Sequence, residues 1–330
     1  MNEKQIQQLK ENCGLPDSCN NLDFKETHIS WIILTDNYAF KIKKPVQFPF
    51  LDFTSLEKRK HYCREELELN KRLAPDMYLK VVPITQDMIE SEKNDDSVID
   101  YAVQMKRMDN AKEMGVLLAK DEVKEDDIDK LAKRVADFHD KTRIIKNVFN
   151  TTEFQKNYAE ILEEYDFVKK NLGEEWAEKM KSCSDKSNIF LNKRRNYMND
   201  RIIRGFIRDC HGDLNAHNIF LYDDPVIFDC IEFNKEFRHI DVYYEIAFLC
   251  IDLEFYNKEE LSKHFHKKYI EYMRIKEDSE DKELFKYYKS FRANIRAKVT
   301  ILREKNKSQN DTKSIHNIKK YLELMYQYLA

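Results

Sequence analysis

The sequence predicts an α+β protein with a two-lobe fold, in which a small β-sheet lobe with one helix precedes a larger, mostly helical lobe. The first hundred or so residues carry strand patterns interrupted by a single helical stretch. Beyond Asp109 the apolar residues recur at helical spacing. The 330 residues are too many for one compact core and suit two lobes. We therefore expect lobes at residues 1–108 and 109–330.

The first lobe is expected to begin with a short polar helix over residues 3–12 and then to form a β-hairpin over residues 26–44. This hairpin is rich in Ile, Trp, Tyr and Phe, which favour strands. Because side chains alternate along a strand, Ala39, Lys41 and Lys43 share one face. A lysine on a strand is commonly solvated, so Lys41 acquires functional meaning only if partners for it are found.

A helix is predicted over residues 51–73, where apolar side chains recur along one stripe. Glu66 falls on that inward stripe, and a buried carboxylate requires a partner because an unpaired buried charge is costly. The helix boundaries leave its phase open, so Glu65 is the alternative. Residues 78–83 and 98–108 are predicted strands separated by a charged hairpin tip at residues 90–96, which makes a sheet of about five strands.

Helices dominate the second lobe. The stretch 121–141 has apolar residues at helical spacing and acidic residues at its start, which suits the helix dipole. Further helices are predicted over 154–172, 188–203, 240–255, 258–274, 284–306 and 315–329. Two short strands are expected at 219–221 and 226–228, joined by an Asp-Asp-Pro turn.

The stretch 207–233 carries four polar residues at a spacing that suits phosphoryl transfer: His211, Asp213, Asn218 and Asp229. Attack on a γ-phosphoryl group requires a carboxylate near the nucleophile and divalent metal ions on the phosphates. Asp213 is the candidate base, and Asn218 and Asp229 offer the hard oxygen ligands that Mg²⁺ prefers. The predicted hairpin would return Asp229 to the side of Asn218. A polar turn between strands is the alternative interpretation.

Composition excludes several classes of protein. The 57 Lys and Arg residues nearly balance the 60 Asp and Glu residues, which argues against a nucleic-acid partner. The five glycines allow neither a GxxxxGK[ST] loop nor a GxGxxG turn. The seven cysteines are scattered without a CxxC pair, so we expect reduced thiols rather than disulfides or a zinc site. No signal peptide and no apolar run of membrane-spanning length is found, so we expect a cytoplasmic protein without a membrane partner.

Two segments resemble the catalytic loop and the metal-binding segment of the aminoglycoside phosphotransferase family, which has a protein-kinase-like fold. They are HGDLNAHN at 211–218 and IFDCIEF at 227–233. The resemblance extends along the chain through YAFKIKKPV, REELELNKRLAPDMYL, the Phe-His-Asp at 138–140, HIDVYYEIAFLCIDLEF and FRANIRAKV. In detail the chain is most similar to a bacterial group of phosphotransferase-like proteins that are often joined to a P-loop ATPase domain. This sequence contains no Walker A motif, so the kinase-like module is expected to stand alone.

The resemblance implies a role for each matching residue. It makes Asp213 the catalytic aspartate, and it makes Asn218 and Asp229 the metal ligands. Lys41 would clamp the α- and β-phosphates, with Glu66 as its ion-pair partner.

The resemblance also assigns the nucleotide's surroundings and the support of the catalytic loop. Ala39 belongs to the A-x-K pattern of the lysine strand, and backbone groups near Met105 and Arg107 would meet the adenine edge. Asp241 would brace the catalytic loop, and His211 would fix that loop rather than act as a base.

Three features depart from the family of protein kinases. The glycine-rich loop over the phosphates is missing, so backbone at 28–30 and 35–37 would have to replace it. Asn215 stands where protein kinases have a lysine, and Cys230-Ile231-Glu232 replaces the Phe-Gly of their DFG motif. The last two features favour a small-molecule kinase.

We therefore expect an ATP- and Mg²⁺-dependent phosphotransferase that acts on a hydroxyl of a small molecule. A nucleotide-binding pseudokinase and a nucleotidyl transferase acting on a protein are the alternatives. Asp241, Glu245 and Asp252 lie on one predicted helix stripe, which would suit a cationic acceptor or would be an ordinary helix surface. Neither the acceptor nor the oligomeric state follows from the sequence.

Overall fold

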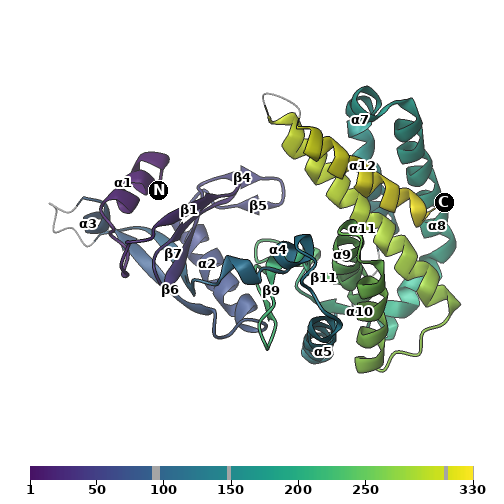
Figure 1. The fold of residues 1–330 in the computed structure, drawn as a ribbon, viewed down its shortest axis with the longest axis horizontal. Helices are drawn as coiled ribbons and strands as arrows, with labels where there is room; N and C mark the ends of the chain where they lie inside the picture. Colours follow the sequence, from purple (N-terminus) through teal and green to yellow (C-terminus); the bar gives the residue numbers. More distant parts are fainter. Residues whose placement is uncertain (91–96, 147–149, 308–310, 330) are drawn as a thin grey trace. The chain divides into compact units, whose positions relative to one another are not determined.

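The computed structural model describes residues 1–90, 97–146, 150–307 and 311–329 (Figure 1). The chain divides into two compact units. The first unit comprises Met1–Leu117 and His217–Phe237, and the second comprises Leu118–Ala216 and Arg238–Ala330. The first unit is therefore built from two separate stretches of sequence.

The first unit contains a five-stranded antiparallel sheet in the order β1-β2-β3-β7-β6. The expected sheet of about five strands with an inserted helix is confirmed. Its elements are α1 (Glu3–Glu11), β1 (Asp23–Glu26), β2 (Ser30–Leu34), β3 (Tyr38–Lys43), β4 (Gln47–Phe48), β5 (Leu51–Asp52), α2 (Leu56–Lys71), β6 (Tyr78–Thr85), α3 (Gln86–Ile89), β7 (Val98–Lys106), η1 (Asn110–Lys112), β9 (Ile219–Phe220), β10 (Val226–Ile227) and η4 (Lys235–Phe237). Helix α4 (Met114–Ala119) and the 3₁₀ turn η3 (Ala216–Asn218) connect the two units in sequence.

The two faces of this sheet carry separate apolar cores. Phe40 and Ile42 of β3 point to the core that α1 covers, and both are fully buried. Ala39 points to the opposite core, which α2 covers with Cys63. The strand alternation that put Ala39 and Lys41 on one face therefore aims Lys41 at the α2 side of the sheet.

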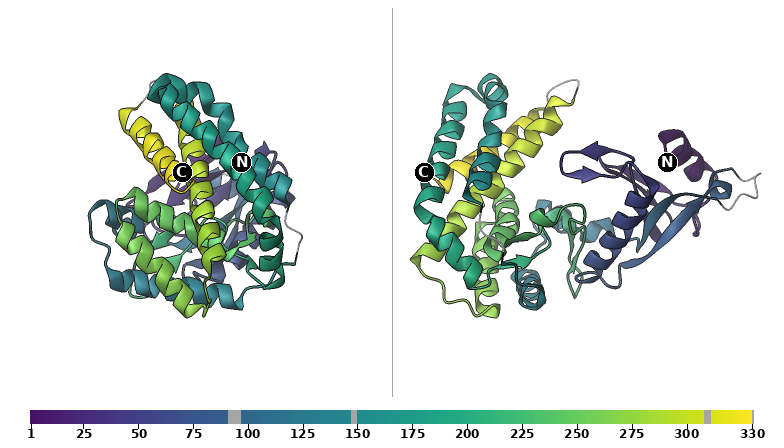
Figure 2. Two further views of the ribbon diagram at one scale, coloured as in Figure 1. Left: turned by 90° about the vertical axis from the view of Figure 1, so that its right-hand side faces the viewer. Right: turned by 180° about the vertical axis from the view of Figure 1, so that it is seen from behind.

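Helices make up most of the second unit, and α11 and α12 lie alongside each other (Figure 2). Helix α9 is buried along almost its whole length and forms the centre of this unit. No helix in the described part of the chain has the length and apolar character needed to cross a membrane. The elements are α5 (Glu125–Lys141), α6 (Thr151–Ala159), η2 (Glu160–Glu164), α7 (Tyr165–Leu172), α8 (Glu174–Ile203), β8 (Ile207–Asp209), β11 (His239–Asp241), α9 (Val242–Phe255), α10 (Glu259–Tyr272), α11 (Ser279–Lys305) and α12 (Thr312–Gln327).

The structure differs from the sequence analysis in the division of the chain. A single boundary at Met108–Asp109 was expected, but the hairpin β9–β10 and the residues after it pack in the first unit. The physical reason is a set of contacts to the sheet and its helix. The backbone N–H of Asp229 donates to Tyr78 Oη (3.2 Å), and that of Cys230 donates to Asn70 Oδ1 (2.9 Å).

The expectation of seven free thiols is wrong for Cys13 and Cys19, which form a disulfide. A tight turn between them brings their Cα atoms to 6.0 Å, within bridging distance, although they are six residues apart. The other five cysteines are buried and form no disulfide among the described residues. The charged hairpin tip expected near residues 90–96 lies, apart from Glu90, outside the described residues.

Candidate functional site

A buried cluster of charges occupies the α2 side of the sheet in the first unit. Lys41 Nζ lies 2.9 Å from Glu66 Oε1 and 2.5 Å from Asp229 Oδ1. Burial lowers the pKa of Lys41, but the carboxylates of Asp229 and Glu66 raise it well above its ordinary value. The partner of Lys41 is therefore Glu66, and the alternative, Glu65, takes no part.

Helix α2 is oriented by its cap and by two inward polar side chains. Ser55 caps its start by accepting a hydrogen bond from the backbone N–H of Lys58. Glu66 and Asn70 lie one turn apart and are fully buried. Glu66 reaches β3, and Asn70 Oδ1 holds the backbone of Cys230, directly after Asp229. One helix therefore positions both the lysine and the metal-ligand candidate.

Asp229 follows the hairpin β9–β10 in a strained conformation. Its φ of 64° lies in the left-handed region, which non-glycine residues rarely adopt. The backbone N–H of the preceding Phe228 donates to the carbonyl oxygen of Asn218 (3.0 Å), as the expected return of the hairpin requires. The Asp229 side chain remains 42% exposed, so its carboxylate is accessible.

The structure adds a second ion pair that the sequence analysis missed. Lys43 Nζ lies 2.7 Å from Glu66 Oε2 and also contacts the carboxylate of Glu232. Lys43 is fully buried, and Glu232 is nearly so. The two oxygens of Glu66 thus each face a different lysine. Burial raises the pKa of Glu66, but Lys41 and Lys43 outweigh this effect and hold it at about 2.

Lys43 and Glu232 fix the segment that carries Asp229. Glu232 stands three residues after Asp229, and its ion pair ties that segment to β3. Without Lys43, Glu66 and Glu232 would be two buried carboxylates competing for Lys41. The strand alternation already placed Lys43 on the same face as Lys41, which was the available signal for this pair.

Replacing Lys43 with Met is expected to lower the free energy of unfolding by about 3–5 kcal/mol, because Glu232 becomes an unpaired buried charge. Urea unfolding at neutral pH measures this loss. The double variant Lys43→Met/Glu232→Gln should recover most of it. The matched control is Lys44→Met, whose partner Glu26 is half exposed, and it should change stability by less than about 1 kcal/mol. Equal losses for the two single variants would contradict this role of Lys43.

The expected adenine contacts lie at the end of β7, where much of the backbone is already paired. Met105 lies inside the sheet between Ala39 and Tyr78. The Arg107 N–H donates to the carbonyl oxygen of Asn37 (2.8 Å), and its guanidinium also holds the turn before β3. Contact of Met105 and Arg107 with adenine stays a prediction. The hydrogen bonds of the sheet and of Arg107 leave few backbone groups at this place available to bind adenine.

The turns expected to replace a glycine-rich loop are closed by side chains. Thr27 Oγ1 accepts hydrogen bonds from the N–H groups of Ile29 (3.3 Å) and Ser30 (2.9 Å). Asp17, between the two disulfide cysteines, accepts from the N–H of Asn37 (2.8 Å). Burial raises the pKa of Asp17, but hydrogen bonds from Asn37 and Thr35 lower it to about 2. These N–H groups therefore already donate hydrogen bonds within the protein. Lys41 is a stronger candidate than the backbone of these turns for binding the phosphates.

The second unit holds the loop that carries Asp213, and α9 fixes this loop from behind. The N–H groups of His211 and Gly212 donate to the two carboxylate oxygens of Glu245, both at 2.7 Å. Further along the loop, the N–H of Ala216 donates to Asp252 Oδ2 (3.0 Å). Asp213 itself is half-buried. Its N–H donates to His211 Nδ1 (3.3 Å), so His211 contacts the loop as a fixing residue would.

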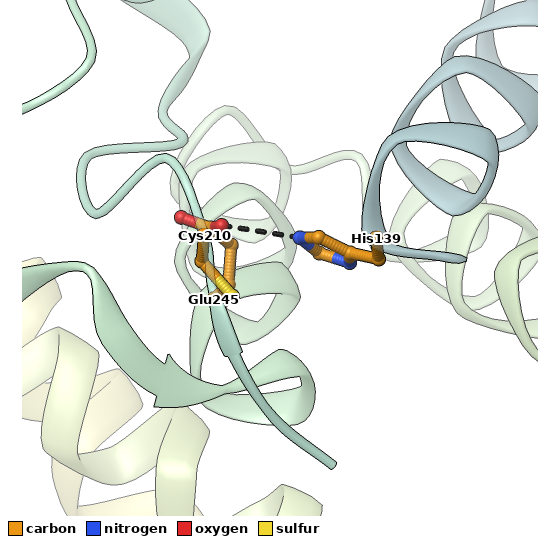
Figure 3. A group of neighbouring side chains, drawn as sticks. All are labelled: His139, Cys210 and Glu245. Atoms are coloured by element: carbon orange, nitrogen blue, oxygen red, sulfur yellow. Dashed lines mark hydrogen bonds and ion pairs between the residues drawn. The ribbon is translucent and has the colours of Figure 1, made fainter. Parts of the chain in front are cut away.

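Glu245 belongs to a buried group with His139 and Cys210 (Figure 3). His139 Nε2 lies 3.1 Å from Glu245 Oε2, and His139 Nδ1 lies 2.7 Å from Tyr269 Oη. Histidine, cysteine and glutamate are side chains that can bind a metal ion. His139 and Glu245, however, already contact each other, and His139 also contacts Tyr269. Burial raises the pKa of the Cys210 thiol, which disfavours the thiolate that a metal requires. We interpret the group as support for the Asp213 loop.

Acid should remove the stabilisation that Glu245 provides. Burial raises its pKa, but His139 and the backbone of His211 lower it to about 2. A carboxylate with a lowered folded-state pKa stabilises fully above about pH 4.5 and loses this effect as the pH falls to about 2. Glu245→Gln should therefore cost about 3 kcal/mol at neutral pH, and the difference should shrink between these limits. Urea unfolding across the pH range tests this, and a pH-independent difference would refute it.

Asp241 is not the brace of the catalytic loop, contrary to expectation. Its carboxylate pairs with Arg201 through two hydrogen bonds (2.6 and 2.8 Å) and caps α9 by accepting from the N–H of Tyr243. Glu245 and Asp252 hold the loop instead. Helical periodicity placed all three carboxylates on one stripe, but it did not show which of them faces the loop.

The same three carboxylates do not form a surface for a cationic acceptor. Asp241, Glu245 and Asp252 are 4%, 0% and 1% exposed, and each holds protein hydrogen-bond donors. The acidic stripe is therefore internal structure of the second unit.

The chain has the protein-kinase-like fold of aminoglycoside phosphotransferases, and several solved small-molecule kinases are similar to it. It is similar to aminoglycoside 2′-phosphotransferase-IIIa in its GDP complex, with a TM-score of 0.58 and 15% identity over 99% of each chain. A choline kinase from Cryptosporidium parvum gives a TM-score of 0.54 and 13% identity, covering 98% of this chain and 96% of the kinase. A choline/ethanolamine kinase family protein from Mesorhizobium loti gives 0.52 and 9%, covering 99% and 98%.

Sequence comparison finds longer relatives. An uncharacterized protein of Mycobacterium tuberculosis is 30% identical over 290 residues, which cover 86% of this chain and 55% of that protein. A Mycobacterium bovis protein matches with the same values. The chain thus spans about half the length of these relatives. No family model matches it.

Proposed function

We propose that this chain is an ATP- and Mg²⁺-dependent phosphotransferase that moves the γ-phosphoryl group to a hydroxyl of a small molecule. The observation that carries the proposal is the buried cluster in which Lys41 joins Glu66 to Asp229. The cluster combines a buried lysine and a buried glutamate with an aspartate whose side chain is 42% exposed. The names of the structural neighbours, which are aminoglycoside phosphotransferases and choline kinases, add support at the level of fold.

The residues present fit a divalent metal ion. Asp229 offers a hard carboxylate, of which Oδ1 contacts Lys41 and Oδ2 takes no hydrogen bond within the described part of the chain. Asn218 offers an amide oxygen, and its backbone is tied to the residue before Asp229. Asp229 and Asn218 would hold Mg²⁺, which neutralises charge on the phosphates when bound.

The protein's own residues perform three tasks in this proposal. Lys41 holds the α- and β-phosphates, and Glu66 keeps the lysine extended and charged. Asp213 accepts the proton of the acceptor hydroxyl, or orients that hydroxyl, as the nucleophile attacks. Its loop is held by Glu245 and Asp252, so the carboxylate needs little reorganisation.

Two measurements test the proposal together. Calorimetry should show ATP binding that strengthens when Mg²⁺ is added. Release of ADP, followed across a library of hydroxyl compounds, should rise above the ATPase background for at least one acceptor. ATP binding without any acceptor-dependent turnover would favour a regulatory nucleotide-binding module instead. Absence of nucleotide binding would remove the proposal altogether.

A further inference from the structure

Two arginines of α11 lie against α9 in the second unit, and the proposed reaction gives them no role. Arg292 and Arg296 stand one helical turn apart and share a face of α11. The Arg292 guanidinium carbon lies 3.8 Å from the centre of the Tyr244 ring, and that of Arg296 lies 5.4 Å from the Tyr321 ring. The Arg292 guanidinium therefore stacks on an aromatic ring, and that of Arg296 lies within cation–π distance of one.

Arg292 is a buried cation without a counter-ion. It is 5% exposed, and its Nε donates to the carbonyl oxygen of Tyr244 (2.9 Å). Its Nη2 is buried without a hydrogen-bond partner. Among the described residues no carboxylate forms an ion pair with it. Because burying an unpaired charge costs several kcal/mol, such a group indicates a missing anion.

Arg201 is a buried arginine with a purely structural role, and it serves as a comparison for Arg292. Its guanidinium also stacks on aromatic rings, at 3.9 Å from Phe206. It is fully buried, and the carboxylates of Asp241 and Asp281 neutralise it from two sides. Arg292 has the same stacking and nearly the same burial but lacks the carboxylates.

Arg296 links this pair to the Asp213 loop. Its Nε lies 3.4 Å from Asp252 Oδ1, and the other oxygen of Asp252 accepts the N–H of Ala216 on that loop. Nε also donates to Tyr321 Oη (3.2 Å), whereas its terminal nitrogens donate no hydrogen bond to any described residue. The Arg296 side chain is 19% exposed, whereas Arg292 is 5% exposed.

The pKa of Arg296 is consistent with its position beside the Asp213 loop. Burial lowers the pKa of Arg296, but Asp252, Tyr321 and Asp213 together raise it above its ordinary value. Asp213 therefore lies within electrostatic reach of Arg296. An anion bound at Arg296 would carry its hydroxyl into the neighbourhood of the Asp213 carboxylate.

We propose that Arg296, supported by Arg292, binds a carboxylate or phosphate group of the acceptor whose hydroxyl is phosphorylated. The acceptor is then an anionic hydroxyl compound such as a hydroxy acid or a sugar phosphate. Arg296 makes the direct contact because it is the more exposed of the two, and Arg292 adds a second positive charge one turn away. The inference rests on the proposed function for the reaction, but the anion site itself does not.

Binding of inorganic phosphate to the full chain tests the site independently of catalysis. Thermal unfolding is followed with increasing phosphate, against chloride at equal ionic strength. Wild type should be stabilised, and Arg296→Gln should weaken the apparent phosphate affinity by about tenfold or more, as expected for loss of a charge-assisted contact. Arg303→Gln is the matched control, because it removes an exposed arginine from the same helix. Lys41→Met should retain the response, which separates this site from the nucleotide site.

Arg292 is buried, so removing its side chain is expected to impair folding. A conservative substitution is therefore used at this position. Arg292→Lys keeps the charge and should weaken phosphate binding less than Arg296→Gln does. A phosphate response that Lys41→Met abolishes, or one that Lys41→Met/Arg296→Gln retains at the affinity of Lys41→Met alone, would overturn the proposal.

Acceptor panels then assign the chemical class. Transfer of γ-label from ATP is measured with hydroxy acids, with sugar phosphates and with aminoglycosides and amino alcohols. We expect turnover with one of the two anionic panels, and a KM for the acceptor raised about tenfold or more in Arg296→Gln with little change in kcat. Turnover with the cationic panel alone, at an unchanged KM in the variant, would overturn the acceptor class. If wild type transfers label to no panel, the proposed function fails, and the phosphate titration still decides whether the anion site exists.

Discussion

Replacing Asp213 with Ala is expected to lower turnover by about a hundred- to ten-thousand-fold, because the acceptor hydroxyl loses the carboxylate that receives or orients its proton. The affinity for ATP should change little, since Lys41 and Asp229 are untouched. The loop should keep its shape, because Glu245 and Asp252 hold its backbone rather than the Asp213 side chain. Steady-state kinetics and calorimetry on the same preparation measure both quantities.

The control for this variant is Asp223→Ala, which removes an exposed carboxylate from the turn between β9 and β10. It should leave both turnover and affinity unchanged. A normal rate in Asp213→Ala would remove Asp213 from the catalytic role. A rate lost together with ATP binding would instead indicate that the variant disturbs the fold.

Replacing Asp229 with Asn is expected to abolish most of the Mg²⁺-dependent part of the ATP affinity. Asn preserves the side-chain shape and tolerates the left-handed backbone at φ 64°, so the hairpin should remain intact. The metal-free affinity should stay the same or rise, because Lys41 loses a competing carboxylate. Titrations with and without Mg²⁺ separate these two effects. Identical titrations for wild type and variant would count against Asp229 as a metal ligand.

The alternation of side chains along β3 was enough to predict which residues point toward α2. It placed Ala39 and Lys41 on one face, and the carboxylate on the inward stripe of α2 completed the Lys41–Glu66 pair. Strand and helix periods report the direction of side chains accurately when an element is regular. The five-stranded sheet and most helices were predicted for the same reason, although α8 is longer than expected because the buried stripe of its first half includes small and polar residues such as Ala177, Ser184 and Ser187.

The periodicity of strands and helices shows toward which side a residue points. It does not show which of several similar side chains contacts a given partner. Lys43 and Glu232 are far apart in sequence, and their pairing depends on how the segment after β10 returns to β3. The same limit explains the error at Asp241, where three carboxylates of one stripe compete for the loop. The Cys13–Cys19 disulfide was missed because the lack of a CxxC pair was taken to indicate free thiols, although Gly14, Pro16 and Asp17 between the two cysteines favour a turn.

Two features of the site bear on the acceptor. The carboxylates that suggested a cationic substrate are buried and satisfied, whereas an unneutralised arginine lies beside the helix that holds the Asp213 loop. Charge complementarity contributes to specificity mainly by excluding the wrong partner. An anionic acceptor is therefore the expectation that the Arg292 and Arg296 experiments address.

Incubation with ATP labelled at either the γ- or the α-phosphate tests the central claim most directly. Wild type and Asp213→Ala are compared, with Mg²⁺ and a pool of hydroxyl compounds. The account predicts that wild type moves only the γ-label to an acceptor and that Asp213→Ala moves almost none. Transfer of the α-label would identify a nucleotidyl transferase. Transfer of neither label by a wild-type protein that binds ATP would contradict the claim that this site performs phosphoryl transfer.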